Sequence, residues 1–150
     1  MPISHLSGFD SILWLLLGLL AVSPLLGIVE RTSLAATQKL LGISLVIAAL
    51  VYVAFALWFG QPLWLLIEAM GLLIYGGFYW LARQFSWLWL AVGWLLHPLW
   101  DVVLHVLGPG QHITPAWYAI ACVSFDFAVA IYIVYRVKIR QPHQQTESEY

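Results

Sequence analysis

Residues 93–108 read GWLLHPLWDVVLHVLG, a strongly apolar stretch with only three titratable side chains. His97, Asp101 and His105 recur at every fourth position, and because four residues of an α-helix turn by about 400°, the three share one helix face. An ionised side chain at the centre of a bilayer costs roughly 2.5–3.5 kcal/mol, and such groups normally face the interior of a bundle and pair there. The stretch therefore predicts a membrane-spanning helix with a polar face turned inward.

The composition of the whole chain also indicates a membrane protein. Of its 150 residues, 63% are hydrophobic and 9% are charged, whereas a soluble domain carries about 25% charged residues. The net charge of −1 provides no basic surface for nucleic acid. A single cysteine, Cys122, excludes an internal disulfide. The expected partner is the lipid bilayer, and no nucleic acid is expected.

Five apolar segments are each long enough to cross a bilayer, which takes about 20 residues. We predict an all-α bundle of five transmembrane helices in a single domain, residues 1–140, followed by a disordered polar tail, residues 141–150. No basic residue precedes the first apolar run, so we expect that run to remain in the mature protein rather than to be cleaved as a signal peptide. The predicted spans are Phe9–Val29, Leu40–Phe59, Pro62–Leu81, Trp87–Leu107 and Trp117–Val137.

The six basic residues predict the orientation of the helices. They fall in the first loop, in the third loop and after the last helix, which five crossings place on one side of the membrane. Since basic loops face the cytoplasm, we expect the N-terminus outside and the C-terminus cytoplasmic, in a bacterial cell membrane or an equivalent membrane. The residues concerned are Arg31, Lys39, Arg83, Arg136, Lys138 and Arg140.

Five titratable side chains within the spans are expected to meet at one depth. Counting about 1.5 Å per residue from the predicted helix ends places Glu68, Asp101 and Asp126 in the outer half of the bilayer, with His97 nearer the midplane and His105 nearer the surface. Three carboxylates facing lipid would cost several kcal/mol, so they should face one another and the histidines. Since carboxylates in one dry site cannot all ionise, at least one should share a proton, an imidazolium or a metal ion.

These residues are the candidate catalytic and metal-binding groups. The catalytic candidates are Asp101, His97, Asp126 and Glu68. His97 and His105 lie about 12 Å apart along the helix axis, so one ion is not expected to bind both. Neighbours four apart can share an ion, so a divalent metal ion would use Asp101 with one histidine, completed by a carboxylate or thiol from another helix. The candidate metal set is His105, Asp101 and Asp126; the cofactor is otherwise unknown.

Six further residues are expected to support this cluster. Pro98 leaves the carbonyl of Trp94 without its usual partner and biases His97 away from helical angles, so we expect the helix to open locally there. Other spans contribute tyrosine hydroxyls and a thiol at a similar depth. The supporting residues are Trp94, Pro98, Trp100, Tyr52, Tyr75 and Cys122.

Each titratable residue also has a structural interpretation. A cation at His105 suits the negative end of a helix dipole. His97, Asp101 and Asp126 can serve as hydrogen bonds between helices, and Glu68 can extend its carboxylate to water at the membrane surface.

The segment GWLLHPLWDVVLHVLG, followed by Pro115, Cys122 and Asp126, resembles a family of small bacterial multi-pass membrane proteins of unknown function. Members carry a GWLLH–WDV–H segment, then a proline and a Cys-Asp pair, and the resemblance covers about residues 92–126. In the family the Cys and Asp lie close together, whereas here three residues separate them. The resemblance implies a shared polar cluster but no reaction, substrate or cofactor. The pattern falls on Trp94, His97, Trp100, Asp101, His105, Cys122 and Asp126.

Three functions fit this sequence. The first is a membrane-embedded enzyme that acts on a lipid or isoprenoid by acid–base or metal-assisted chemistry. The second is a non-catalytic subunit or assembly partner, in a homo-oligomer or a membrane complex. The third is a proton- or ion-coupled carrier. Polar contacts between membrane helices contribute only about 0.6 kcal/mol each, and no Asp, Glu or His lies in the inner half of a span, so the enzyme ranks first.

Overall fold

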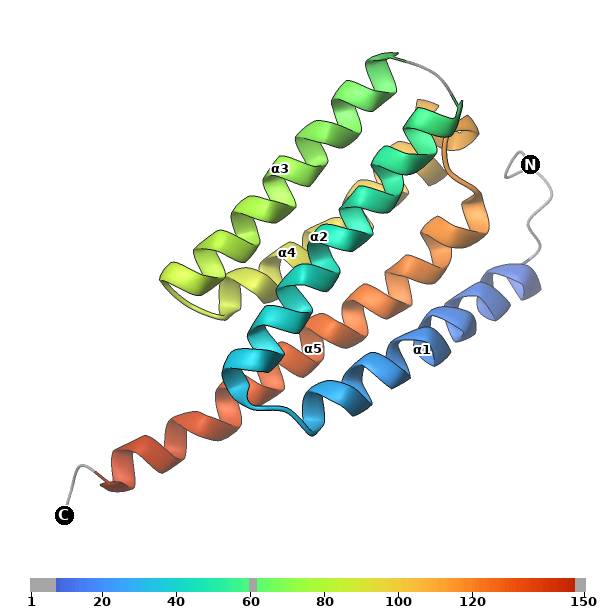
Figure 1. Cartoon of the computed structure of the whole chain (residues 1–150). Coiled ribbons are helices and arrows are strands. Elements are labelled where there is room, and N and C mark those ends of the chain that lie inside the picture. The colour runs from blue at the N-terminus through green and yellow to red at the C-terminus, as the bar shows by residue number, and fades with distance from the viewer. Residues whose placement is uncertain (1–7, 60–61, 148–150) are drawn as a thin grey trace.

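The computed structural model describes residues 8–59 and 62–147, and within these ranges the chain is helical and contains no strand. Short turns at residues 31–33 and 85–87 join the first helix to the second and the third helix to the fourth (Figure 1). The elements are α1 (Gly8–Glu30), α2 (Leu34–Phe59), α3 (Pro62–Gln84), α4 (Leu88–Asp101), the π-helical turn η2 (Val102–Val106), the 3-10 turn η3 (Pro109–His112) and α5 (Ala116–Glu147).

Five segments of the described chain are long and apolar enough to cross a membrane, with α4 and η2 together forming the fourth. The prediction of an all-α, multi-pass membrane protein is therefore confirmed. The second span begins at Leu34 rather than at the predicted Leu40, because Ser33 caps this end: its hydroxyl oxygen accepts from the amide of Ala36 at 3.4 Å. The turn predicted at Gly60 and Gln61 lies outside the described residues.

The C-terminal segment differs from its prediction. Residues 141–150 are predicted to be disordered, whereas α5 continues to Glu147 and projects past the ends of the other helices (Figure 1). Residues 148–150 lie outside the described chain.

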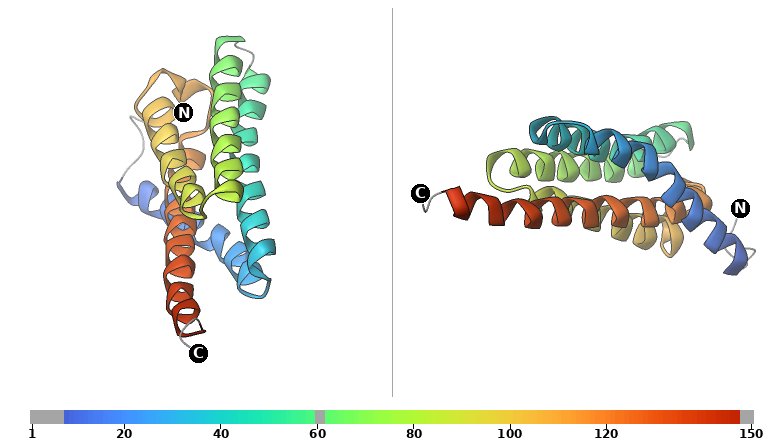
Figure 2. Two further views of the ribbon diagram at one scale, coloured as in Figure 1. Left: turned by 90° about the vertical axis from the view of Figure 1, so that its left-hand side faces the viewer. Right: turned by 90° about the horizontal axis from the view of Figure 1, so that it is seen from below.

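The helices form two layers. The antiparallel pair α2 and α3 lies over the antiparallel pair α4 and α5, and α1 crosses the outer side of α5 (Figures 1 and 2). Within the α2–α3 layer, Gln38 donates to the carbonyl oxygen of Ala82 at 2.7 Å and so joins the two helices. Although α1 and α2 are consecutive, α1 packs mainly on α5 and hardly touches α2. The first two helices therefore diverge.

The close approach of α1 to α5 depends on a glycine. A Cβ atom on Gly18 would overlap the carbonyl oxygen of Ala121 and the hydroxyl of Ser124. That hydroxyl donates to the carbonyl oxygen of Leu15 at 2.6 Å. Small residues at membrane-helix interfaces allow backbones to approach in this way. Gly18 thus sets the position of α1 on α5.

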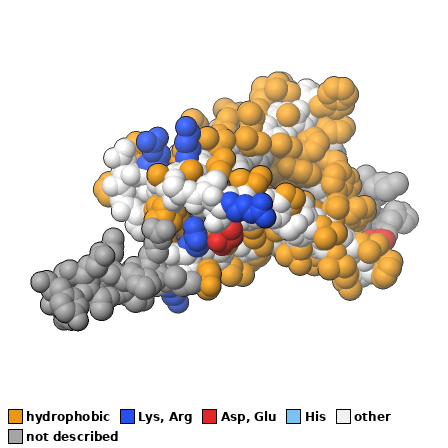
Figure 3. All heavy atoms as spheres, turned by 60° about the horizontal axis from the view of Figure 1, so that its bottom comes forward, with side chains coloured by type: hydrophobic (Ala, Val, Ile, Leu, Met, Phe, Trp, Pro, Cys, Tyr) orange, Lys and Arg blue, Asp and Glu red, His pale blue; other side chains and the backbone are white. Residues whose placement is uncertain are grey.

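The surface separates into an apolar body and a basic end. Large hydrophobic side chains are exposed on all five helices, as expected where a helix faces lipid. The described Lys and Arg side chains gather at one end of the molecule (Figure 3). Among them, Arg136 forms a 3.3 Å ion pair with Glu30. This distribution agrees with the prediction that the basic loops share one side of the membrane. Which side faces the cytoplasm stays a prediction.

The tight contact at Gly18 predicts a difference between two substitutions in the same helix. Gly18→Ala should lower the free energy of unfolding by about 1–3 kcal/mol, because the added methyl group overpacks the α1–α5 interface. Gly27→Ala is the matched control, since Gly27 is exposed and nothing lies within 4 Å of the added methyl. Unfolding of the purified variants in detergent measures both, and equal stability of the two would contradict this account of the interface.

The predicted orientation is tested with single cysteines. In a Cys122→Ala background, Gln111→Cys and Ser33→Cys place thiols at exposed positions in the fourth and first loops. A membrane-impermeant maleimide should label Gln111→Cys in intact cells and Ser33→Cys only after the membrane is permeabilised. The reverse labelling pattern would show that the predicted orientation is inverted. Labelling of both cysteines in intact cells would contradict the prediction that the first and fourth loops lie on opposite sides of the membrane.

Candidate functional site

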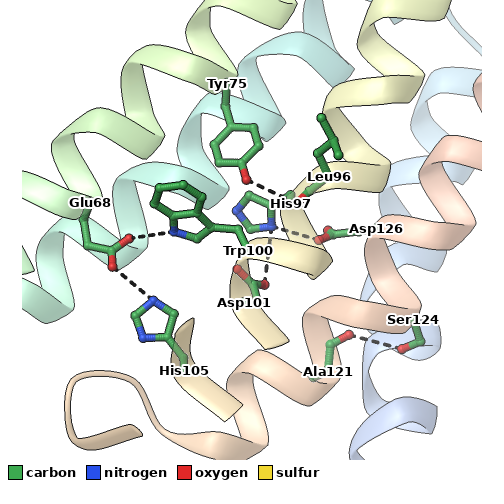
Figure 4. Close-up of polar contacts among 10 residues, drawn as sticks. All are labelled: Glu68, Tyr75, Leu96, His97, Trp100, Asp101, His105, Ala121, Ser124 and Asp126. Atoms are coloured by element: carbon green, nitrogen blue, oxygen red, sulfur yellow. Dashed lines mark hydrogen bonds and ion pairs between the residues drawn. The ribbon is translucent and has the colours of Figure 1, made fainter. Parts of the chain in front are cut away.

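The titratable residues of the spans form a buried group inside the bundle (Figure 4). None of the five side chains is more than 2% exposed. α3 contributes Glu68, α4 contributes His97 and Asp101, the turn η2 contributes His105, and α5 contributes Asp126. The predicted inward burial is confirmed, and it applies to Glu68 as well, whose carboxylate does not reach the surface.

His97 lies between two carboxylates. Its Nδ1 is 2.8 Å from Oδ2 of Asp126, within a hydrogen bond, and 3.4 Å from Oδ2 of Asp101. An imidazole nitrogen carries at most one proton, so Nδ1 cannot donate a good hydrogen bond to both carboxylates. Neither oxygen of Asp101 takes part in an aligned hydrogen bond, although the hydroxyl of Tyr52 approaches it. Asp101 is thus the carboxylate whose charge the described residues satisfy least.

Glu68 and His105 form a second, separate pair. Nδ1 of His105 is 3.2 Å from the carbonyl oxygen of Gly110, and because a carbonyl only accepts, Nδ1 carries a proton. Nε2 of His105 is 3.0 Å from Oε1 of Glu68, at ion-pair distance although not in hydrogen-bond alignment. Two unprotonated atoms would repel at this distance, so one of them carries a further proton. Trp100 donates to Oε2 of Glu68 at 3.3 Å and fixes the carboxylate from its other side.

A change of helix type separates the two groups. α4 is α-helical through Pro98 to Asp101, so the opening predicted near His97 occurs instead one turn later, in η2. There the amide of Leu107 donates to the carbonyl of Val102 at 2.8 Å, five residues back. A π-helical turn has more residues per turn than an α-helix, which rotates His105 out of the face that His97 and Asp101 share. His105 therefore meets Glu68 on α3 rather than Asp126 on α5.

Aromatic rings enclose both imidazoles. The ring of Tyr52 lies 5.6 Å from the ring of His97 and 4.9 Å from the ring of His105, measured between centroids, so Tyr52 stands between the two groups. Tyr75 packs against His97 at 4.9 Å, and Trp64 against His105 at 5.6 Å. These contacts exclude water and hold each imidazole in one orientation.

The other supporting residues occupy different places around the group. Tyr75 donates to the carbonyl oxygen of Leu96 at 3.4 Å. The indole of Trp100 lies against Gly71, where an added Cβ would come within 3.2 Å of it, so the glycine makes room for the donor to Glu68. Trp94 is completely buried, and its Nε1 has no hydrogen-bond partner in the described chain. Cys122 is partly buried on α5.

A lateral cleft of about 450 Å³ lies between α1 and α2. It exists because α1 leaves α2 and packs on α5. Its walls are almost wholly apolar, and Asp126 is the one carboxylate among its lining residues, beside Trp94 and Cys122. The cleft therefore joins the apolar surroundings of the bundle to the acidic end of the His97 group.

Two features of the site were absent from the sequence analysis. One is Gly110, whose carbonyl orients His105; the other is the α1–α2 cleft. A glycine next to Pro109 indicates a turn, but the direction of its carbonyl depends on η2 and η3. No short sequence pattern predicts the cleft, because the cleft depends on the packing of helices that are distant in the sequence.

The model of a family of unknown function, DUF6010, matches residues 11–138, a range that includes all five buried titratable residues. The chain belongs to this family. The resemblance to an uncharacterised family is thereby confirmed. Comparison of this DUF6010 protein with curated proteins and with solved structures finds no significant match. Its chemistry is therefore inferred from its own geometry.

The residues of this DUF6010 protein that can share one metal ion differ from the predicted set by one histidine. His97, Asp101 and Asp126 each offer a ligand atom, and these atoms lie within 4.8 Å of one another. His105, expected in place of His97, has its two nitrogens directed at Gly110 and Glu68 instead. An imidazole flanked by two carboxylates is suited to proton transfer and to the binding of a divalent cation.

The Glu68–His105 pair of this DUF6010 protein predicts unequal effects of two substitutions at one position. Glu68→Leu should lower the free energy of unfolding by about 3–5 kcal/mol, because it leaves the partners of a buried ion pair uncompensated. Glu68→Gln should cost much less, since the amide accepts from Trp100 and donates to Nε2 of His105. Unfolding in detergent compares the two, and equal losses would contradict the protonation assigned to His105.

Proposed function

We propose that this protein is a membrane-embedded enzyme that acts on the polar group of a lipid or isoprenoid, with His97, Asp101 and Asp126 as its reactive centre. The observation that carries the proposal is the contact between the α1–α2 cleft and Asp126. Asp126 both lines this apolar cleft and forms the 2.8 Å hydrogen bond with His97. A hydrocarbon chain fits the walls of such a cleft, and a polar end group fits its floor.

The proposal assigns a role to each group that the cleft reaches. Asp126 contacts the polar group of the substrate. Trp94 is one of the lining residues of the same cleft, its Nε1 is a buried donor without a partner in the described chain, and we assign to this donor an oxygen of that group. His97 and Asp101 act from behind Asp126. In a site closed to water, such interactions are stronger than at an exposed surface.

The second pair supplies a proton store behind the reactive centre. Glu68 and His105 hold the additional proton, and Tyr52 lies between them and His97. A carboxylate and an imidazole can each take up and return a proton, as general acids and bases do. The five titratable residues predicted from the sequence thus form a reactive centre at the cleft and, behind it, a pair that holds a proton.

The alternative functions have less support. A carrier requires polar groups through the whole thickness of the membrane, but no Asp, Glu or His of the described residues lies between the buried group and the basic end. In an assembly partner the buried polar groups would serve only to pair the helices, as His97 with Asp126 and Glu68 with His105 do. Asp101 and Trp94, by contrast, present buried polar atoms without a hydrogen bond in the described chain. Association with a second copy or with another membrane protein stays a prediction.

The proposal predicts a change in cellular lipids. In cells that lack the endogenous gene, the wild-type protein should convert a lipid species that accumulates without it, whereas Asp126→Asn should lower the turnover by roughly 10²- to 10⁴-fold, the usual effect of losing an acid–base group. Untargeted mass spectrometry of membrane lipids measures the difference. Identical lipid profiles for the wild type and Asp126→Asn, with both proteins folded and in the membrane, would contradict an enzymatic role for this centre.

Two tryptophan substitutions in α1 test the route of the substrate. Ala21 lines the cleft, whereas its neighbour Leu20 is 70% exposed on the lipid face and lies outside the cleft. Ala21→Trp should block the cleft and lower turnover by about 10²-fold through misplacement of the substrate, and Leu20→Trp should leave it unchanged. Equal turnover in the two variants would exclude this cleft as the entrance.

A further inference from the structure

His97, Asp101 and Asp126 surround a common point from two helices. Nδ1 of His97 is 2.8 Å from Oδ2 of Asp126 and 3.4 Å from Oδ2 of Asp101. Protein ligands bind a divalent first-row metal at about 2.0–2.2 Å, which sets neighbouring ligand atoms about 3 Å apart. We propose that these three side chains bind a divalent metal ion, with its open coordination position facing the α1–α2 cleft.

The unsatisfied carboxylate of Asp101 is an independent observation in favour of a cation. Asp101 is 0% exposed, and neither of its oxygens takes part in an aligned hydrogen bond. A buried charge is costly unless it is paired or coordinates a metal. No Lys or Arg of the described residues forms an ion pair with Asp101 or Asp126, and the described basic side chains gather at one end of the molecule (Figure 3).

Charge balance favours a divalent ion over protons alone. Two carboxylates carry two negative charges, which a divalent cation bound with neutral His97 cancels completely. An imidazolium cancels only one of them, so the second carboxylate would have to be protonated. His97 already bonds to Asp126, so the proton would have to bind Asp101, which has no aligned hydrogen bond in the described chain and only the approaching hydroxyl of Tyr52 beside it.

The donor set indicates which ions fit. One imidazole nitrogen and two carboxylate oxygens suit Zn²⁺, Fe²⁺ and Mn²⁺, whereas Cu(I) prefers sulfur ligands. Cys122 does not belong to the group of three, although it lines the cleft. Three protein ligands leave room for a water or substrate ligand, as in catalytic zinc sites. Because Asp126 lines the cleft, this open position is the one that a polar group in the cleft would reach.

The proposed metal site rests on the proposed function, because both use the same three residues. The test of metal binding nevertheless does not depend on turnover. The probe is Mn²⁺, added to chelator-treated, folded protein in detergent. We expect stoichiometric binding, and a nitrogen coupling from His97 in the electron-nuclear double resonance spectrum of the bound Mn²⁺. Asp101→Asn and Asp126→Asn should each weaken binding by more than the 10- to 100-fold that loss of an outer partner causes. His97→Gln should remove the nitrogen coupling.

Glu68→Gln is the matched control, because it also replaces a buried carboxylate by an amide but lies outside the group of three. It should bind Mn²⁺ like the wild type. Circular dichroism establishes that each variant is folded, and Asp126→Asn serves if Asp101→Asn does not fold. Failure of the folded wild type to bind Zn²⁺, Fe²⁺ or Mn²⁺ would overturn the proposal. Binding of Mn²⁺ by the Asp and His variants that equals the binding by the wild type would also overturn it. Altered lipids without bound metal would overturn the metal site alone, whereas bound metal with unaltered lipids would overturn the proposed function alone.

Discussion

A carboxylate inside an apolar bundle has to be satisfied by the protein, because the surrounding lipid provides neither charge nor hydrogen bonds. Glu68, Asp101 and Asp126 come from three different helices, so this constraint ties α3, α4 and α5 together at one level. α4 lies between the other two, and α4 together with its continuation η2 supplies both imidazoles. The polar interior is accordingly organised around α4, while the outer faces of all five helices remain free to be apolar.

The local irregularities of the chain serve this arrangement. The turn η2 directs His105 at Glu68, and the carbonyl of Gly110 decides which nitrogen of His105 faces the carboxylate. Without the change from α to π geometry, both histidines would crowd the same side of α4 as Asp101. The result is two groups with different chemistry: a pair with its proton in place, and a group of three in which Asp101 lacks an aligned partner.

The position of α1 leaves the α1–α2 cleft beside the group of His97, Asp101 and Asp126. Gly18 allows α1 to lie closely on α5, and the resulting divergence from α2 leaves a cleft that reaches Asp126. The Glu68–His105 pair has no place on the lining of this cleft. The proposed amphipathic ligand and the proposed metal ion both depend on this arrangement, in which an almost wholly apolar cleft has Trp94 and Asp126 among its lining residues.

The sequence by itself determined the membrane class, the five spans and the inward burial of the five titratable residues, because the cost of a charge in lipid depends on composition and helical spacing alone. It also pointed to the family through the segment around His97. It did not determine which histidine joins Asp101 and Asp126, since α-helical spacing places His97 and His105 on one face and only the π turn separates them. Nor could it show the cleft, because the packing of α1 on α5 rather than on α2 is decided by contacts between segments about a hundred residues apart, such as Ser124 with Leu15, and this packing exists only in the folded bundle.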